Sequence, residues 1–190
     1  MDPEPARHVP GEEGLWVFIL GDMTIFALLF GAFLGARRDA PGEFATGGAE
    51  LNMVIGIANT LVLLVSSAAV ALAVQAHRTG RIAAASTMLL GAMACGLIFV
   101  TLKVIEWTEL LSHHQPPGAG QFFGYYFGMT GLHLLHLVLG TVALVVVRRT
   151  VRRGTAQRRD RLIIEAGSSY WHMVDLLWII IFPLVYLVPA

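Results

Sequence analysis

The sequence predicts an all-α polytopic membrane bundle of five transmembrane helices. Of its 190 residues, 56% are hydrophobic and only 14% are charged, whereas soluble domains are about half apolar and a quarter charged. The apolar residues also form continuous stretches rather than the alternation typical of barrel strands. We therefore expect a single five-helix membrane domain over residues 15–190, preceded by a cytoplasmic N-terminal tail over residues 1–14.

The first apolar stretch is Leu15–Ala36. The segment before it is rich in proline and acidic residues and lacks the basic region of a signal peptide, so we expect this stretch to be retained as the first span. Each of the five stretches has about 19 to 26 residues, or roughly 28–39 Å of helix, which is enough to cross a hydrocarbon core of ~30 Å. The four later spans are predicted at Asn52–Ala76, Ile82–Ile105, Phe122–Val147 and Tyr170–Val188.

The distribution of basic residues predicts the orientation of the bundle. Cytoplasmic segments of membrane proteins carry an excess of Arg and Lys. On one side of the predicted spans, the connecting segments contain only Arg37 and Arg38. The segments on the other side carry ten basic residues, so we expect the N-terminus inside and the C-terminus outside. These ten are Arg7, Arg78, Arg81, Arg148, Arg149, Arg152, Arg153, Arg158, Arg159 and Arg161.

Small residues and one proline indicate how the spans pack. Helices in lipid approach closely where small residues recur four positions apart. Pro183 lacks an N–H donor and is expected to kink the last span or fray its outer half. The small-residue pairs are Gly31 with Gly35, Ala92 with Gly96, and Gly124 with Gly128.

Ionisable residues inside the predicted spans are the candidates for function. A charged side chain at the bilayer centre costs at least ~2–3 kcal/mol, so such residues are expected to have partners. The i,i+3 spacing predicts that Lys103 pairs with Glu106. It also predicts that His172 and Asp175 share a helix face and partly neutralise each other. By depth, we expect one polar cluster near the inner side. Its members are Asp22, His136, His172 and Asp175, with Glu165 at the rim and His133 nearby on the fourth span.

Four interpretations of these groups remain open from the residues alone. The three histidines could ligate haem, or they could hold copper or zinc, and Asp22, His136 and Asp175 could relay protons. The fourth interpretation, which we favour, is a hydrogen-bonded network that fixes helix register and contacts lipid or a partner subunit. The single cysteine, Cys95, excludes a disulfide framework and a cysteine-based metal cage within the chain.

Four sequence blocks are more specific than the composition. They are ANTLVLLVSS at 58–67, KVIEW at 103–107, TGLHLLHLVLG at 130–140 and EAGSSYWHMVDLLW at 165–178. Together with the first span, GLWVFILGDMTIFALLFGAF, they resemble subunit III of the haem-copper oxidases in its five-helix bacterial form. Asp22 stands where that family has a buried acid, usually Glu, and Lys103 stands where it often has Gln. The other matching positions are Glu106, His133, His136, Glu165, His172 and Asp175.

The resemblance implies a supporting role rather than a catalytic one. It implies no cofactor in this chain, with haem and copper held by partner subunits I and II, and bound phospholipid. It further implies a respiratory-chain oxidoreductase complex in the bacterial inner (plasma) membrane, with electron transport from cytochrome c or quinol to oxygen. This chain would stabilise the catalytic subunit and support its proton uptake.

Two alternatives accompany this interpretation. The opening PGEEGLWVFILGDM also resembles accessory subunits of nitric oxide reductases. A protein of another class, a free-standing membrane haem protein or small transporter, would use His133, His136 and His172 directly. The formal net charge of zero argues against a nucleic-acid partner.

Overall fold

The computed structural model describes residues 13–112, 116, 118–154 and 157–187. These residues form helices and turns, with no β-strand among them. The helices are α1 (Glu13–Asp39), α2 (Pro41–Ala49), α3 (Met53–Arg78), α4 (Ile82–Ser112), α5 (Gln121–Arg153) and α6 (Arg158–Phe182), followed by the π-helical turn η1 (Pro183–Leu187).

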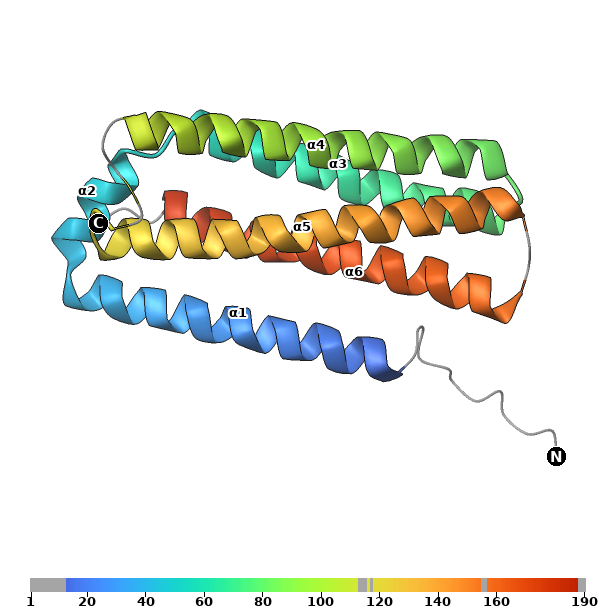
Figure 1. The fold of residues 1–190 in the computed structure, drawn as a ribbon, viewed down its shortest axis with the longest axis horizontal. Coiled ribbons are helices and arrows are strands. Elements are labelled where there is room, and N and C mark those ends of the chain that lie inside the picture. The colour runs from blue at the N-terminus through green and yellow to red at the C-terminus, as the bar shows by residue number, and fades with distance from the viewer. Residues whose placement is uncertain (1–12, 113–115, 117, 155–156, 188–190) are drawn as a thin grey trace.

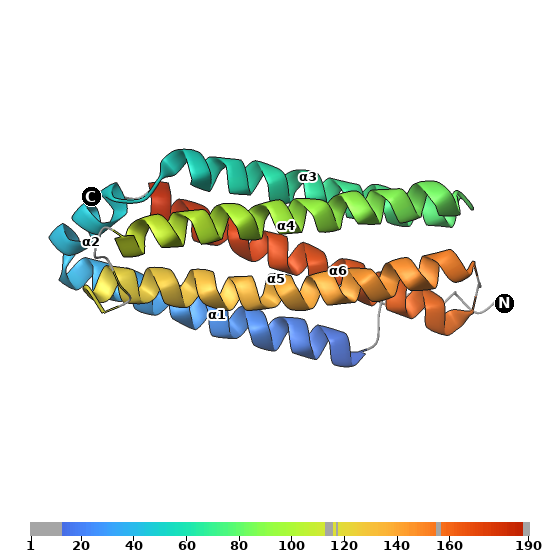
Figure 2. The same ribbon diagram turned by 45° about the horizontal axis from the view of Figure 1, so that its top comes forward.

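The predicted all-α class with five spans is confirmed. Within the described ranges, five helices are long and apolar enough to cross a membrane, and α2 is too short to do so. The helices α3, α4, α5 and α6 pack in a ring, each against the next, with α6 returning to α3. The first span, α1, lies outside this ring against α5 and α6 (Figures 1 and 2). The inside–outside orientation and the division at residue 15 stay predictions.

Several helices extend beyond the predicted spans. The largest difference is at α6, which begins at Arg158 rather than at Tyr170. Hydropathy detects only the part of a helix that lies in hydrocarbon, whereas backbone hydrogen bonding continues through polar residues outside it. Of the predicted tail 1–14, residues 13 and 14 belong to α1, and residues 1–12 lie outside the described part of the chain.

The short helix α2 was not predicted, because its Gly- and Ala-rich sequence has neither the length nor the hydrophobicity of a span. It packs across the start of α5, where Phe44 meets the ring of Phe122 at a centroid distance of 5.7 Å. The carboxylate of Glu43 accepts hydrogen bonds from the backbone N–H groups of Gln121 and Phe122. It thereby satisfies donors that the first turn of α5 would otherwise leave free.

One tryptophan of α6 connects all four helices of the ring. The Trp171 side chain is fully buried, and its Nε1 donates to Ser66 Oγ of α3 at 3.1 Å. Its ring lies against Gly96 of α4 and Gly140 of α5, where an added Cβ would come within 3.1 and 2.9 Å of ring atoms. The predicted small-residue face at Gly96 is therefore a packing contact. By contrast, an added Cβ at Gly31 or Gly35 would meet nothing within 4 Å.

The proline of the last span changes the helix type rather than fraying the helix. The α-helical pattern of α6 stops at Phe182, and the chain continues from Pro183 as the wider turn η1. A proline ring clashes with the carbonyl four residues earlier, and a widened turn relieves that clash. Tyr186 of η1 is buried, which gives this turn a role in the polar site described next.

Candidate functional site

The most completely bonded polar group in the bundle surrounds Lys103 of α4. Lys103 and Glu106 are 0% and 1% exposed, and Lys103 Nζ lies 2.6 Å from Glu106 Oε2. Two phenols close the group: Tyr126 of α5 and Tyr186 of η1. We call these four residues the Lys103 cluster. The predicted pairing of Lys103 with Glu106 is thus present in the structure.

The hydrogen bonds of the Lys103 cluster are complete. An ammonium group has three donors, and Lys103 Nζ contacts Glu106 Oε2 at 2.6 Å, Tyr186 OH at 2.7 Å and Tyr126 OH at 3.3 Å. The two phenols donate in turn to the carboxylate: Tyr126 OH to Oε2 at 2.9 Å, and Tyr186 OH to Oε1 at 2.8 Å. Every donor and every charge is therefore compensated inside the bundle.

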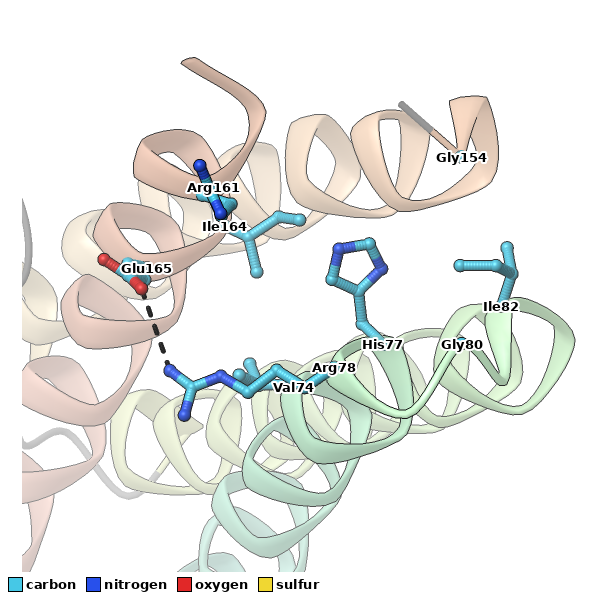
Figure 3. Close-up of a pocket in the computed structure, with 9 residues that line it drawn as sticks. All are labelled: Val74, His77, Arg78, Gly80, Ile82, Gly154, Arg161, Ile164 and Glu165. Carbon is cyan, nitrogen blue, oxygen red and sulfur yellow. Dashed lines mark ion pairs between the residues drawn. The ribbon is translucent and has the colours of Figure 1, made fainter. Parts of the chain in front are cut away.

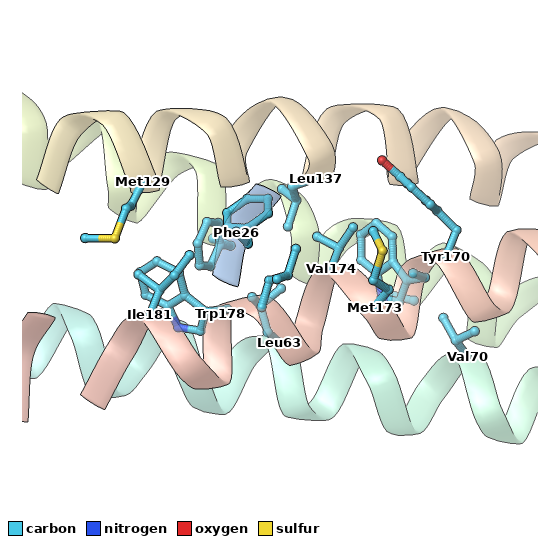
Figure 4. Close-up of a cluster of buried hydrophobic side chains, with 14 of the residues drawn as sticks. Phe26, Leu63, Val70, Met129, Leu137, Tyr170, Met173, Val174, Trp178 and Ile181 are labelled. Atoms are coloured by element: carbon cyan, nitrogen blue, oxygen red, sulfur yellow. The ribbon is translucent and has the colours of Figure 1, made fainter. Parts of the chain in front are cut away.

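Aromatic rings provide the rest of the environment of the ammonium group. Lys103 Nζ lies 4.8 Å from the ring centroid of Trp178, a cation–π distance. Trp178 is held in turn by a hydrogen bond from its Nε1 to Thr60 Oγ1 of α3, at 3.0 Å. The close-up in Figure 4 shows Trp178 among the buried apolar side chains of the core. The Lys103 cluster itself joins α4, α5 and η1, and Trp178 connects it to α6 and, through Thr60, to α3.

A second polar contact joins α1 to the ring. His136 Nε2 of α5 lies 3.0 Å from Asp22 Oδ1, and both side chains are buried. His136 Nδ1 lies 2.7 Å from the carbonyl oxygen of Leu132, which can only accept, so Nδ1 carries a hydrogen. The Nε2–Oδ1 contact is a polar link between α1 and α5.

The other two members of the predicted cluster are not paired with each other. His172 Nδ1 lies 2.7 Å from Ser67 Oγ of α3, on the opposite side of the ring from α1. Neither oxygen of Asp175 has a partner with hydrogen-bond geometry in the described residues, although the Ser67 hydroxyl lies beside this carboxylate. The expected His172–Asp175 neutralisation is therefore wrong, because the serine of the neighbouring helix takes the imidazole.

His133 is packed by aromatic rings rather than by polar groups. It is 0% exposed, with ring centroids of Phe99 at 5.4 Å and Trp178 at 5.3 Å. Neither of its ring nitrogens has a hydrogen-bond partner in the described part of the chain. The packing favours a neutral imidazole that serves as part of the core.

Glu165 lies at the rim, as its place in the sequence predicts. Its Oε1 is 3.7 Å from Arg78 Nη2 of α3, and the two side chains are 32% and 69% exposed. This loose pair sits at the end of the bundle where α3 turns into α4. Solvent screening makes such a pair a weak contributor to stability.

The histidines do not converge on one point. His133 packs on Phe99 and Trp178, His136 faces Asp22, and His172 faces Ser67. Across the described residues, no group of three or more His, Cys, Asp or Glu side chains is arranged to hold a metal ion. That this chain binds no cofactor remains a prediction.

Sequence reasoning missed the residues that complete these contacts. Tyr126, Tyr186 and Trp178 surround Lys103, and Ser67 binds His172. Tyr126 and Tyr186 lie near the ends of their spans, where aromatic residues are usually interfacial anchors, so their sequence positions gave no signal of burial. The hint that the sequence offered was a lysine and a glutamate within one span, because a single ion pair leaves further donors and acceptors to be satisfied.

Comparison with known proteins agrees with the fold. The family model described as "Cytochrome c oxidase subunit III" matches residues 11–189. The chain is 30% identical over 180 residues to the "Heme-copper oxidase subunit I+III" of Aeropyrum pernix, covering 92% of this chain but only 22% of that longer protein.

Shorter relatives match along most of their length. The chain is 29% identical to the "Probable cytochrome c oxidase subunit 3" of Mycobacterium tuberculosis, covering 92% of this chain and 86% of that one. It is 26% identical to the "Cytochrome bo(3) ubiquinol oxidase subunit 3" of Buchnera aphidicola, covering 92% and 84%. With five membrane helices and a match over nearly its whole length, the chain belongs to the cytochrome c oxidase subunit III family of haem-copper oxidases.

Proposed function

We infer that this chain is a supporting subunit of a bacterial respiratory haem-copper oxidase in the plasma membrane. It packs beside the haem- and copper-bearing subunit I, with subunit II in the same complex. It stabilises subunit I, holds phospholipid and supports proton uptake, while partner subunits pass electrons from cytochrome c or quinol to oxygen. The eight ionisable residues that were compared with the family pattern serve structure and assembly. They are Asp22, Lys103, Glu106, His133, His136, Glu165, His172 and Asp175.

The observation that carries this proposal is the fused relative. In the Aeropyrum protein, subunits I and III are named as one polypeptide, and this chain is similar to a part of it. A fused pair of subunits is expected to be in contact within one assembly. The Lys103 cluster supports the same proposal, because a fully compensated charge pair suits a rigid scaffold.

No observation favours association with a nitric oxide reductase. The three relatives reported above are named as oxidase subunits. A free-standing haem protein would need histidines that face one another, whereas His133, His136 and His172 each contact a different neighbour.

The proposal is tested by purifying the tagged full-length chain from its own membranes in mild detergent. We expect a larger haem-containing protein to co-purify, and its Soret absorption to remain with that protein when the two are separated. The matched measurement uses His136→Ala in the same strain. A stoichiometric Soret signal in the separated wild-type chain that disappears in His136→Ala would overturn the supporting role. So would purification of the chain without any haem protein.

A further inference from the structure

A cavity of about 390 Å³ opens at the end of the bundle where α3 turns into α4, and where α5 ends and α6 begins. Figure 3 shows its residues, with His77 projecting from α3 to a place beside Ile164 of α6. None of these residues belongs to the buried polar site except Glu165 at the rim. The cavity is therefore a separate feature from the buried polar site.

The polar lining of the cavity is mainly cationic. Arg78 and Arg161 both line it, and among the described lining residues the one acid is Glu165, whose Oε1 is 3.7 Å from Arg78. The guanidinium group of Arg161 forms no ion pair or hydrogen bond with another described residue, and only its backbone N–H is bonded, to the Gln157 carbonyl. His77 Nδ1 is buried and also lacks a hydrogen-bond partner within the described ranges. Two guanidinium groups and an imidazole are therefore available to an anion, and the one competing carboxylate is held loosely.

The rest of the lining is apolar or open. Val74 of α3, Ile82 of α4 and Ile164 of α6 supply hydrocarbon surface. Gly80 and Gly154 lie at the mouth with φ of 76° and 65°, a region that favours glycine, and a Cβ at either position would meet nothing within 4 Å. A lining that combines cationic groups with hydrocarbon surface, as α3 and α6 both do here, fits an amphiphile better than a hydrated inorganic ion.

The surrounding charge favours an anionic ligand. This end of the bundle also carries Arg residues that do not line the cavity: Arg81, Arg148, Arg149, Arg152, Arg153, Arg158 and Arg159. Asp160 and Glu165 are the acids in the first two turns of α6. Clusters of this kind attract anionic lipid headgroups by about 1 kcal/mol per basic residue near the membrane surface.

We propose that this cavity binds the phosphate group of an anionic phospholipid. Arg78 and Arg161 contact the phosphate oxygens, His77 donates a hydrogen bond, and the first carbons of the lipid lie against Val74, Ile82 and Ile164. The inference rests on the proposed lipid binding of this subunit and assigns it a site. Anchoring a lipid here ties the α3–α4 turn to the start of α6.

The test measures lipid binding by native mass spectrometry of the complex purified through the full-length chain. Phosphatidylglycerol and phosphatidylcholine with identical acyl chains are added in separate titrations. We expect Arg161→Gln to weaken phosphatidylglycerol binding about fivefold, the effect of one basic residue. Arg159→Gln is the matched control, because it removes the same charge from the same helix turn outside the cavity, and it should weaken binding clearly less than Arg161→Gln does.

A second variant is expected to change binding in the opposite direction. Glu165→Gln removes the carboxylate that competes for Arg78, so phosphatidylglycerol should bind more tightly than to the wild type. Phosphatidylcholine binding should respond little to any of the three variants, because its headgroup has no net charge. A large loss in Arg161→Gln, a gain in Glu165→Gln and a smaller loss in the Arg159→Gln control together separate a site from a diffuse basic surface.

Three results would overturn the assignment. The first is an equal loss in Arg161→Gln and Arg159→Gln, and the second is an equal affinity of the wild type for the two lipids. The third is displacement of phosphatidylglycerol by an equal concentration of inorganic phosphate, which would make this a site for free phosphate. In each case the haem content of the purified complex is measured as well. Normal haem content rejects this inference alone, whereas a missing haem subunit rejects the proposed function.

Discussion

Buried polar groups are fully hydrogen-bonded in the Lys103 cluster, whereas in the middle of the bundle several of them have no hydrogen-bond partner. Around Lys103, two charges and two phenols satisfy all of one another's donors. In the middle, both oxygens of Asp175 and both ring nitrogens of His133 have no hydrogen-bond partner in the described structure. The difference teaches that a polar residue within a membrane helix is not by itself evidence of a stabilising network. Its contribution depends on the side chains that neighbouring helices bring to it.

The largest loss of stability is expected in the Lys103 cluster, where the buried charges are most completely paired. Glu106→Leu leaves the Lys103 ammonium buried with only two neutral phenols, and breaking a buried ion pair in this way costs about 3–5 kcal/mol. The free energy of unfolding in mixed detergent micelles measures the loss.

The matched control for this prediction is the double variant Lys103→Met with Glu106→Leu. Removing both charges restores an apolar interior, so most of the lost stability should return. The single variant Lys103→Met is measured as well. If the double variant loses as much free energy of unfolding as the two single variants lose in sum, the two residues do not act as a pair.

An intermediate effect is expected at the contact between α1 and α5. Asp22→Leu leaves His136 Nε2 without a partner, which costs about 1–3 kcal/mol for a buried polar group. Asp22→Asn should cost much less, because its amide N–H can donate to Nε2 while Nδ1–H remains on the Leu132 carbonyl. Unfolding midpoints of the two variants, measured side by side, decide the point. Equal destabilisation by Leu and Asn would mean that the ionic charge, rather than the hydrogen bond, matters.

The smallest effect is expected at Asp175. Its carboxylate has no well-formed hydrogen bond to lose, so Asp175→Leu should change the free energy of unfolding by no more than about 1 kcal/mol. His172→Leu is the companion variant, because it removes the bond to Ser67 and should be the more destabilising of the two. A loss at Asp175 as large as that of Glu106→Leu would remove the distinction between the two regions.

Much of the fold could be predicted from the sequence, and only part of the site. Continuous apolar stretches predicted the five spans, and the i,i+3 spacing predicted the contact between Lys103 and Glu106, because both depend on residues close in the chain. The same spacing was misleading for His172 and Asp175. There a serine 105 positions away in the sequence competes for the imidazole, and local spacing cannot reveal it.

Helix ends show the same division between local and distant information. The spans at α3 and α4 start at or next to the predicted residues, with Asn52 capping α3 through hydrogen bonds from the N–H groups of Val54 and Ile55. The early start of α6 and the existence of α2 were not predicted. Both depend on packing against α5, which hydropathy does not measure.

Hydrophobicity and helical periodicity can be read along the chain, so a five-span helical bundle with ionisable groups inside could be predicted without a structure. Which of those groups form hydrogen bonds could not, because their partners come from other helices. Tyr126 and Tyr186 reach Lys103 from α5 and η1, and Ser67 reaches His172 from α3. The physical reason is that a hydrogen bond is short and directional, so its formation depends on how separate helices are placed to within about an ångström.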